Sequence, residues 1–232
     1  MEMDARLKTG VKGLDTLIQG GFVKTSVNLV SGPPGTGKTM FGTQFVFEGL
    51  KNGETVMFVT LEEGMAKVKK IMNQLNMEPD KHIEGGKLFI FDLGETSTPS
   101  QGDMTESKSF PEMIEFINTI LQVSKPTRIV IDSLPPLHAN YRTNESFRRD
   151  LARFTRFLQD KELTSLLITE KINDKLTRFN VEEFLCDAFF LVDLQRDDNN
   201  LKRTFEIRKM RFTQFNNTIH TAVIGPTGLD VF

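Results

Sequence analysis

The segment GPPGTGKT at residues 32–39 constrains this chain more than any other part of its sequence. It fits the phosphate-loop pattern G-x-x-x-x-G-K-[ST] at every required position. The apolar run before it, SVNLVS, is typical of a strand, and the residues from Lys38 onward have the apolar spacing of a helix. A strand, a glycine loop and a helix in this order place successive backbone N–H groups around phosphate oxygens. The sequence therefore predicts a nucleoside triphosphate site here, in preference to a chance glycine turn.

The residues of this loop have separate expected roles. Gly35 and Gly37 permit backbone angles that a side chain forbids. Lys38 is expected to bridge the β- and γ-phosphates, and the Thr39 hydroxyl to bind Mg²⁺. The residues expected to contact the nucleotide are Gly32, Gly35, Thr36, Gly37, Lys38, Thr39 and Met40.

Composition limits the class of protein. The chain has 232 residues, of which 38% are hydrophobic and 26% charged, so it can build a real core. We expect one α/β domain over residues 1–232 rather than two small ones. A net charge of −2 gives no electrostatic reason for tight nucleic-acid binding. A single cysteine, Cys186, excludes an internal disulfide and fits a reducing cytosol. No apolar run approaches the length of a membrane span, and we expect a cytoplasmic protein.

Apolar strands and amphipathic helices alternate as far as residue 187, which predicts a mainly parallel sheet with helices on both faces. The strand-like runs are 26–31, 56–60, 88–91, 129–131 and 166–169. Beyond residue 187 the pattern changes, because four strand-like runs follow with no helix between them. These runs are 188–194, 203–211, 219–224 and 229–232, and the first two are separated by the turn signal DDNN. They predict an antiparallel extension of the same sheet. Residues 94–109 are polar and predict a loop.

Three carboxylates follow predicted strands at the expected phosphate end of the sheet. Asp132 ends the apolar run RIVID, where a carboxylate is needed to hold Mg²⁺ directly or through water. Glu62 and Glu63 follow the strand VMFVT, where a carboxylate can orient and deprotonate an attacking water. Thr60 and Glu63 also have the spacing of a helix capping box, and the two interpretations are compatible if Glu63 caps the helix while Glu62 faces water.

Several motifs together resemble the KaiC branch of the RecA-type ATPases. They are, in order along nearly the whole chain, TGVKGLD, GPPGTGKT, FVTLEE, IVIDSL, ITEKIND and EIRKMR. The resemblance implies a RecA-like core that assembles as a hexameric ring, with ATP between neighbouring subunits. The catalytic glutamates of the family fall on Glu62 and Glu63. Its trans-acting Lys-x-Arg falls on Lys209 and Arg211, with Thr213 close behind as a further nucleotide contact.

The Lys-x-Arg pair is also interpretable from the residues alone. A strand period of two would put Lys209 and Arg211 on one face, in line with Phe205 and Ile207. Two cations at the end of an apolar face are costly unless an anion meets them. The γ-phosphate of a neighbouring subunit would do so, like an arginine finger. The alternative is an edge strand protected by charge against aggregation.

The chain departs from its relatives at three places. Cyanobacterial KaiC has two such domains in tandem, and its phosphorylated Ser-Thr pair falls here on Glu183 and Phe184, which cannot accept phosphate. The chain therefore resembles the domain that only hydrolyses ATP, and autokinase activity elsewhere stays open. Recombinases carry a glutamine after the fifth strand, where this chain has Glu170. Phe215 and Asn216 replace the usual Ser-His.

We therefore expect a slow, Mg²⁺-dependent ATPase that forms a homo-hexamer and serves a regulatory role with an unknown protein partner. One alternative is a recombinase-like protein that uses residues 202–211 and 171–179 as a DNA surface. The near-neutral charge and Glu170 do not favour nucleic acid. A third interpretation is an assembly protein in which nucleotide only holds the ring together.

Overall fold

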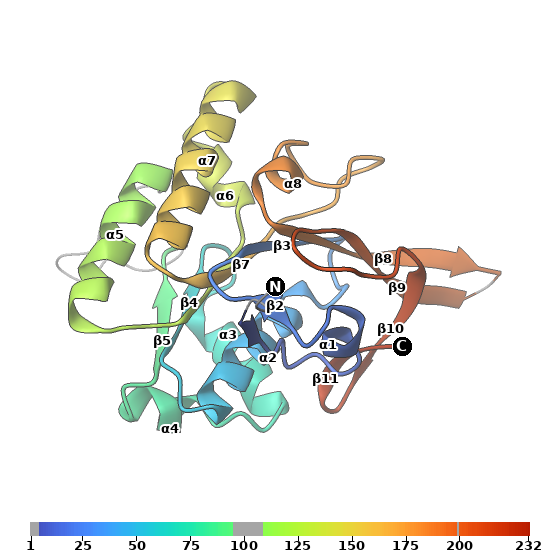
Figure 1. Cartoon of the computed structure of the whole chain (residues 1–232), viewed down its shortest axis with the longest axis horizontal. Coiled ribbons are helices and arrows are strands. Elements are labelled where there is room, and N and C mark those ends of the chain that lie inside the picture. Colours follow the sequence, from blue (N-terminus) through green and yellow to red (C-terminus); the bar gives the residue numbers. More distant parts are fainter. Residues whose placement is uncertain (1–4, 95–108, 199) are drawn as a thin grey trace.

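A nine-stranded sheet forms the centre of the molecule, in the order β11-β10-β9-β8-β3-β7-β6-β4-β5 (Figure 1). The computed structural model describes residues 5–94, 109–198 and 200–232. The strands of this sheet are β3 (Val27–Ser31), β4 (Val56–Thr60), β5 (Leu88–Asp92), β6 (Arg128–Asp132), β7 (Thr164–Ile168), β8 (Ala188–Asp197), β9 (Asn200–Met210), β10 (Ile219–Gly225) and β11 (Gly228–Val231). A separate pair joins β1 (Arg6–Leu7) to β2 (Phe22–Val23).

The sheet has a parallel part and an antiparallel part. Strands β8, β3, β7, β6, β4 and β5 pair in parallel, and β9, β10 and β11 continue the sheet in antiparallel fashion. The strands β3, β4, β6 and β7 are buried along their whole length, which explains their unbroken apolar sequences. The predicted parallel sheet with an antiparallel C-terminal extension is confirmed. The predicted loop at 94–109 lies almost wholly outside the described residues.

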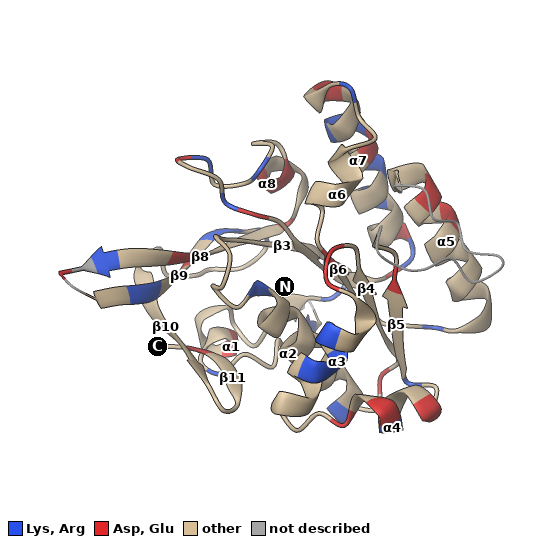
Figure 2. Ribbon diagram, turned by 180° about the vertical axis from the view of Figure 1, so that it is seen from behind, with Lys and Arg blue, Asp and Glu red and all other residues tan. Residues whose placement is uncertain are grey.

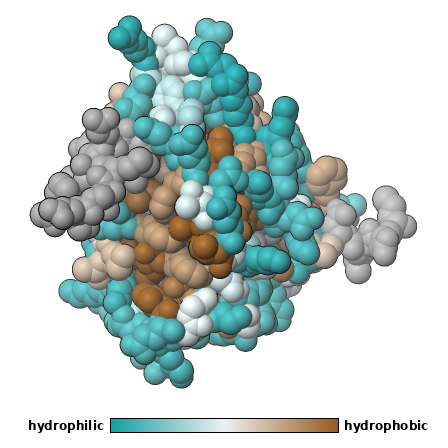
Figure 3. Space-filling view, turned by 90° about the vertical axis from the view of Figure 1, so that its left-hand side faces the viewer, coloured by the Kyte–Doolittle hydropathy of each residue, from teal (hydrophilic) through white to brown (hydrophobic). Residues whose placement is uncertain are grey.

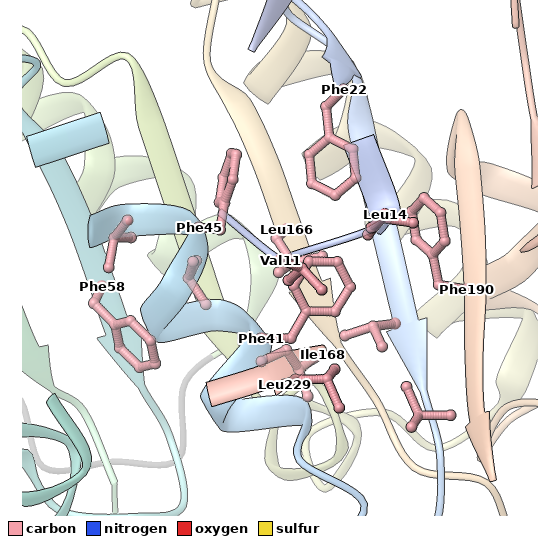
Figure 4. Packing of buried hydrophobic residues seen from close by; sticks show 14 of the residues in the cluster. Val11, Leu14, Phe22, Phe41, Phe45, Phe58, Leu166, Ile168, Phe190 and Leu229 are labelled. Atoms are coloured by element: carbon pink, nitrogen blue, oxygen red, sulfur yellow. The ribbon is translucent and has the colours of Figure 1, made fainter. Parts of the chain in front are cut away.

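Helices cover both faces of the sheet. One face carries α1 (Leu14–Leu17), α2 (Lys38–Lys51), α3 (Met65–Gln74) and α4 (Pro79–Glu84). The other carries α5 (Phe110–Val123), α6 (Pro135–His138), α7 (Asn144–Asp160) and α8 (Glu182–Leu185). Each face has its own apolar core. Figure 4 shows the first core, where Phe41 and Phe45 of α2 pack with Phe22 and Phe190. Within the described residues, no helix has both the length and the apolar character needed to cross a membrane.

Strand β5 is one edge of the sheet. Figure 3 looks onto the side of the molecule where β5 and α5 lie in Figure 1, and apolar surface is exposed there between hydrophilic regions. The partly buried Phe89 and Phe91 of β5 belong to this edge. Phe91 contacts Phe116 of α5 edge-to-face, with 4.9 Å between ring centroids.

Candidate functional site

The phosphate loop lies between β3 and α2, as the sequence predicts. Gly35 and Gly37 have φ angles of 76° and 100°, which glycine adopts without strain. A side chain on Gly32 would place its Cβ 2.1 Å from the carbonyl oxygen of Val192, so the loop can begin here only with glycine. Thr36 is buried and donates its hydroxyl to Pro33 O at 2.9 Å. The Thr36 side chain therefore holds the loop together from inside.

Lys38 is held within this loop. Its Nζ donates to Gly32 O at 2.8 Å and to Pro33 O at 2.9 Å. Burial lowers the pKa of Lys38, and the carboxylates of Asp132, Glu170, Glu62 and Glu63 act against that lowering. The ammonium group is thus surrounded by carbonyl dipoles and distant carboxylates, and an anionic phosphate is the ligand that such a group favours.

Asp132 lies at the end of β6 with only 5% of its surface exposed. The pKa of Asp132 is raised to about 6. Burial is the largest cause of this rise and the nearby Glu63 and Glu62 add to it, whereas a hydrogen bond with Thr39 acts in the opposite direction. Its Oδ2 is buried without a hydrogen-bond partner. A buried carboxylate oxygen without a partner, next to the Thr39 hydroxyl, fits a Mg²⁺ ion bound directly or through water.

Glu62 and Glu63 follow β4 directly, beside Asp132. Leu61 N donates to Asp132 O at 2.7 Å, which ties the end of β4 to the end of β6. Glu62 is exposed, and its Oε2 accepts from Ser133 Oγ at 2.5 Å. Glu63 forms an ion pair with Lys67 of α3. The structure thus leaves Glu62 as the freer of the two carboxylates, as expected.

The predicted capping box does not form. Helix α3 begins at Met65 and is preceded by Gly64, so Thr60 lies too early to cap it. The Thr60 hydroxyl donates to Glu63 O at 2.5 Å, and the amide of Met65 donates to Asp92 Oδ2 at 3.0 Å. A carboxylate from the neighbouring strand β5 therefore caps α3, and the Glu63 side chain pairs with Lys67 instead of capping the helix.

Lys38, Asp132 and the two glutamates line one cleft of about 540 Å³ at the carboxyl ends of the parallel strands. Glu170, after β7, also lines the cleft and accepts from Arg178 at 2.5 Å. Figure 2 shows lysines gathered on α3, of which Lys67 reaches the cleft. The lining residues are Pro34, Gly35, Gly37, Lys38, Thr39, Met40, Glu62, Glu63, Lys67, Ile71, Asp132, Ser133, Glu170 and Ile224.

Arg203 of β9 is a further candidate residue for the phosphate-loop site that no sequence motif indicates. Its Nη2 donates to Gly35 O at 3.3 Å, and its Nε is buried without a partner. Burial lowers the pKa of Arg203. Side chains two residues apart in a strand lie on the same face, so Arg203 lies on the face of the buried Phe205, which packs in the same core as α2. This spacing could have indicated Arg203 as a candidate from the sequence.

Lys209 and Arg211 lie at the opposite end of the sheet from the phosphate loop. Lys209 Nζ donates to Glu183 O at 3.1 Å and to Cys186 O at 2.5 Å. Arg211 donates its amide to Asp187 O at 3.0 Å and its Nη1 to Asp187 Oδ1 at 3.2 Å. Asp187 is bonded to Val27, where β3 begins. The length of β3, on the order of 15 Å, thus separates these cations from their own phosphate loop.

The expectation that Lys209 and Arg211 share a face with Ile207 is wrong. Ile207 pairs with Phe190, but Lys209 pairs with Phe189, so Arg208 is an extra residue in β9. This β-bulge turns Lys209 to the α8 side of the sheet. Arg211 lies just beyond the end of β9 and is half exposed. Thr213 accepts from Arg6 Nη1 at 2.7 Å, so its hydroxyl is held beside these cations.

Comparisons with known proteins agree with this architecture. The family model described as "ATPase: KaiC" matches residues 7–232. A UPF0273 protein of Thermotoga maritima is 30% identical over 237 residues, covering 99% of this chain and 97% of the relative. The circadian clock oscillator protein KaiC of Synechococcus elongatus is 30% identical over 231 residues. That alignment covers 98% of this chain and 44% of the clock protein, so the chain spans less than half of its length.

A solved structure is similar over its whole length. The crystal structure of a KaiC-like protein from the hyperthermophilic archaeon Pyrococcus horikoshii matches with a TM-score of 0.86 and 31% identity. The match covers 99% of both chains. The family model and these relatives do not favour the DNA-associated alternative.

Proposed function

Because the chain belongs to the KaiC family of ATPases, we propose that it hydrolyses ATP slowly in a ring, each nucleotide lying between two subunits. One observation carries the proposal. Lys38, Asp132 and Glu62 line one cleft at one end of the sheet, whereas Lys209 and Arg211 are fixed at the other end. A second copy of the chain is the natural way to bring the two groups together.

The phosphate loop supplies binding. Its backbone amides and the start of α2 attract anionic oxygens, and Lys38 exchanges its two carbonyl partners for the β- and γ-phosphates. Thr39 and Asp132 would hold Mg²⁺, which supplies charge neutralisation at the phosphates when bound. The buried, unpartnered Oδ2 of Asp132 supports this assignment.

Glu62 is the proposed base. It is exposed toward the cleft, and a hydrogen bond from Ser133 orients it. The attacking water forms a bond to the γ-phosphorus, the bond to the β–γ bridging oxygen breaks, and the water proton passes to Glu62 Oε. Glu63 is engaged by Lys67, so it is expected to contribute charge and position rather than to accept the proton.

Lys209 and Arg211 are the proposed cations that act on a neighbour's ATP. Burial lowers the pKa of Lys209, and the adjacent Arg211 lowers it further. A γ-phosphate that becomes more negative during transfer would stabilise both charges. Thr213, whose hydroxyl accepts a hydrogen bond from Arg6, is the further residue proposed to contact the same nucleotide. A hexameric ring and a regulatory role with a protein partner complete the proposal.

Phosphate release from ATP with Mg²⁺ tests the proposal. Glu62→Gln is expected to bind ATP as the unchanged protein does but to turn it over at least a hundredfold more slowly, because only proton acceptance is lost. Glu63→Gln is the matched control and should retain more activity. Undiminished turnover in the double variant would remove both glutamates from the mechanism. An unchanged protein without measurable turnover would instead favour nucleotide as a purely structural ligand.

A further inference from the structure

A buried carboxylate that the proposed reaction does not use lies at the start of α8. Glu182, the first residue of α8, has no exposed surface. Its partners are neutral: the Thr169 hydroxyl donates to Oε1 at 3.0 Å, and the amides of Phe179 and Val181 donate at 3.4 and 3.2 Å. No lysine or arginine of the described residues forms an ion pair with it. Burying a carboxylate among neutral donors is costly.

In the hydrogen bond between Thr169 and Glu182, the Thr169 side belongs to the nucleotide cleft. Thr169 follows β7 directly, and its amide donates to Val30 O of β3 at 3.0 Å. The next residue, Glu170, lines the cleft, and the amide of Lys171 donates to Gly32 O of the phosphate loop at 3.2 Å. Thr169 therefore lies on backbone that is hydrogen-bonded to β3 and, two residues later, to the phosphate loop.

The Glu182 side of this hydrogen bond belongs to the segment that holds Lys209 and Arg211. Glu183, next to Glu182, and Cys186, at the end of α8, provide the carbonyl oxygens that hold Lys209. Asp187 provides the oxygens that hold Arg211. A displacement of α8 would consequently re-aim Lys209 directly, and it would reach Arg211 through Asp187, the residue that follows the C-cap of the helix.

We propose that Glu182 is a positioning residue. It links the nucleotide bound by one subunit to the orientation of Lys209 and Arg211 of that same subunit, the two cations that act on the ATP of its neighbour. ATP and ADP differ by the negative γ-phosphate, and the Glu170 carboxylate lines the cleft. Repulsion between the two supplies the differential interaction that a switch requires. Movement of residues 169–171 passes through the Thr169–Glu182 hydrogen bond to α8. Successive sites around the ring are thereby coupled.

The inference rests on the proposed action of Lys209 and Arg211 in trans, so that action is tested first. Mixing Arg211→Ala with Lys38→Ala subunits should restore turnover. If it does not, the trans assignment fails. If it does, and the variants described next behave as the unchanged protein, only the link through Glu182 fails.

Thr169→Val removes the link while leaving the shape and the carboxylate. We expect turnover to fall about tenfold or more with nucleotide affinity unchanged, because a small misplacement of catalytic groups is costly. Thr169→Ser should restore turnover, since it keeps the hydroxyl. Thr155→Val is the matched control: Thr155 is also buried, but its hydroxyl bonds Ala152 O of its own helix. Normal turnover in Thr169→Val, or an equal loss in Thr155→Val, would overturn the inference.

Amide hydrogen exchange gives a readout that does not depend on turnover. In the unchanged protein, residues 182–187 should exchange at different rates with ADP and with a non-hydrolysable ATP analogue. In Thr169→Val, and in Glu182→Leu as a second variant that lacks the acceptor oxygen, that difference should disappear, while residues 32–39 stay protected by either nucleotide. A difference that persists in both variants would show that α8 responds by another route, and the inference would be wrong.

Discussion

Lys38 is a cation whose hydrogen bonds go to two carbonyl groups of its own loop. Lys38→Ala is expected to abolish ATP binding, because it removes the positive charge that meets the phosphates. Lys67→Ala is the control, since Lys67 lines the same cleft but is exposed and paired with Glu63. Calorimetric titration with an ATP analogue measures both. Equal losses in the two variants would mean that only the general charge of the cleft matters.

Asp132 gives the protein without metal a defined pH dependence. Its pKa is raised by burial from 3.8 to about 6, so the folded state holds the proton more tightly than the unfolded state. Its favourable contribution is therefore present below about pH 4 and is lost as pH rises through about 6. Each pH unit between the two pKa values is worth about 1.4 kcal/mol, so the loss is about 3 kcal/mol.

Asp132→Asn isolates this contribution because asparagine does not titrate. In chelator, the variant is expected to gain stability relative to the unchanged protein between pH 4 and 6, by about 3 kcal/mol, and to hold that gain above pH 6. Urea unfolding across this range measures the difference. A difference that is flat with pH would mean that Asp132 is not the group that titrates.

The residue scale separates what the sequence could predict from what it could not. The phosphate loop and Asp132 were predictable because their signal is local: a glycine pattern, and an apolar strand that ends in an acid. Asp92 as the cap of α3, and Arg203 beside Gly35, were missed. Their partners lie 27 and 168 residues away, and only the order of strands in the sheet brings them together.

At the scale of elements, β9 shows why the aim of Lys209 could not be predicted. Strand alternation places Lys209 with Ile207, but the bulge at Arg208 reverses it. A bulge leaves little trace in an alternating sequence, because the extra residue is itself exposed and charged. The predicted parallel sheet and its antiparallel extension were nevertheless confirmed, since these depend on burial over five or more residues.

Deletion of Arg208 tests the bulge. Without Arg208, Ile207 and Lys209 would still oppose Phe190 and Phe189, so Lys209 should still face α8. The deletion also removes the ion pair between Arg208 and Glu206. This pair is half exposed, so it contributes little to stability. We expect the deletion variant to fold and to keep most of its ATP turnover.

Deletion of Glu206 is the matched control. Glu206 lies in the regular part of β9, where removing one residue would turn Ile207 away from its core and place Arg208 opposite Phe190. That variant should lose stability and turnover. If the Arg208 deletion is as damaging as the Glu206 deletion, the register described for β9 is wrong.

At the scale of the whole molecule, the sheet separates the two groups of residues that the proposed reaction uses. The phosphate loop lies at the carboxyl end of β3, and Arg211 lies beside Asp187 at its amino end. Neither a motif nor a composition reveals this separation, because it depends on β9 running antiparallel to β8. A chain built in this way is expected to be active only when two copies meet head to tail.

Complementation between inactive subunits tests this expectation. Arg211→Ala should bind ATP at its intact phosphate loop but turn over about a thousandfold more slowly, the usual contribution of an arginine finger. Lys38→Ala should bind no ATP but keep its cations. In a mixture, some interfaces pair an intact loop with an intact Arg211, so turnover should return to a fraction set by the mixing ratio. Subunit exchange is verified by native mass spectrometry. Exchange without recovery, or full turnover by a protein that stays monomeric with ATP and Mg²⁺, would show that Arg211 does not act on a neighbouring subunit.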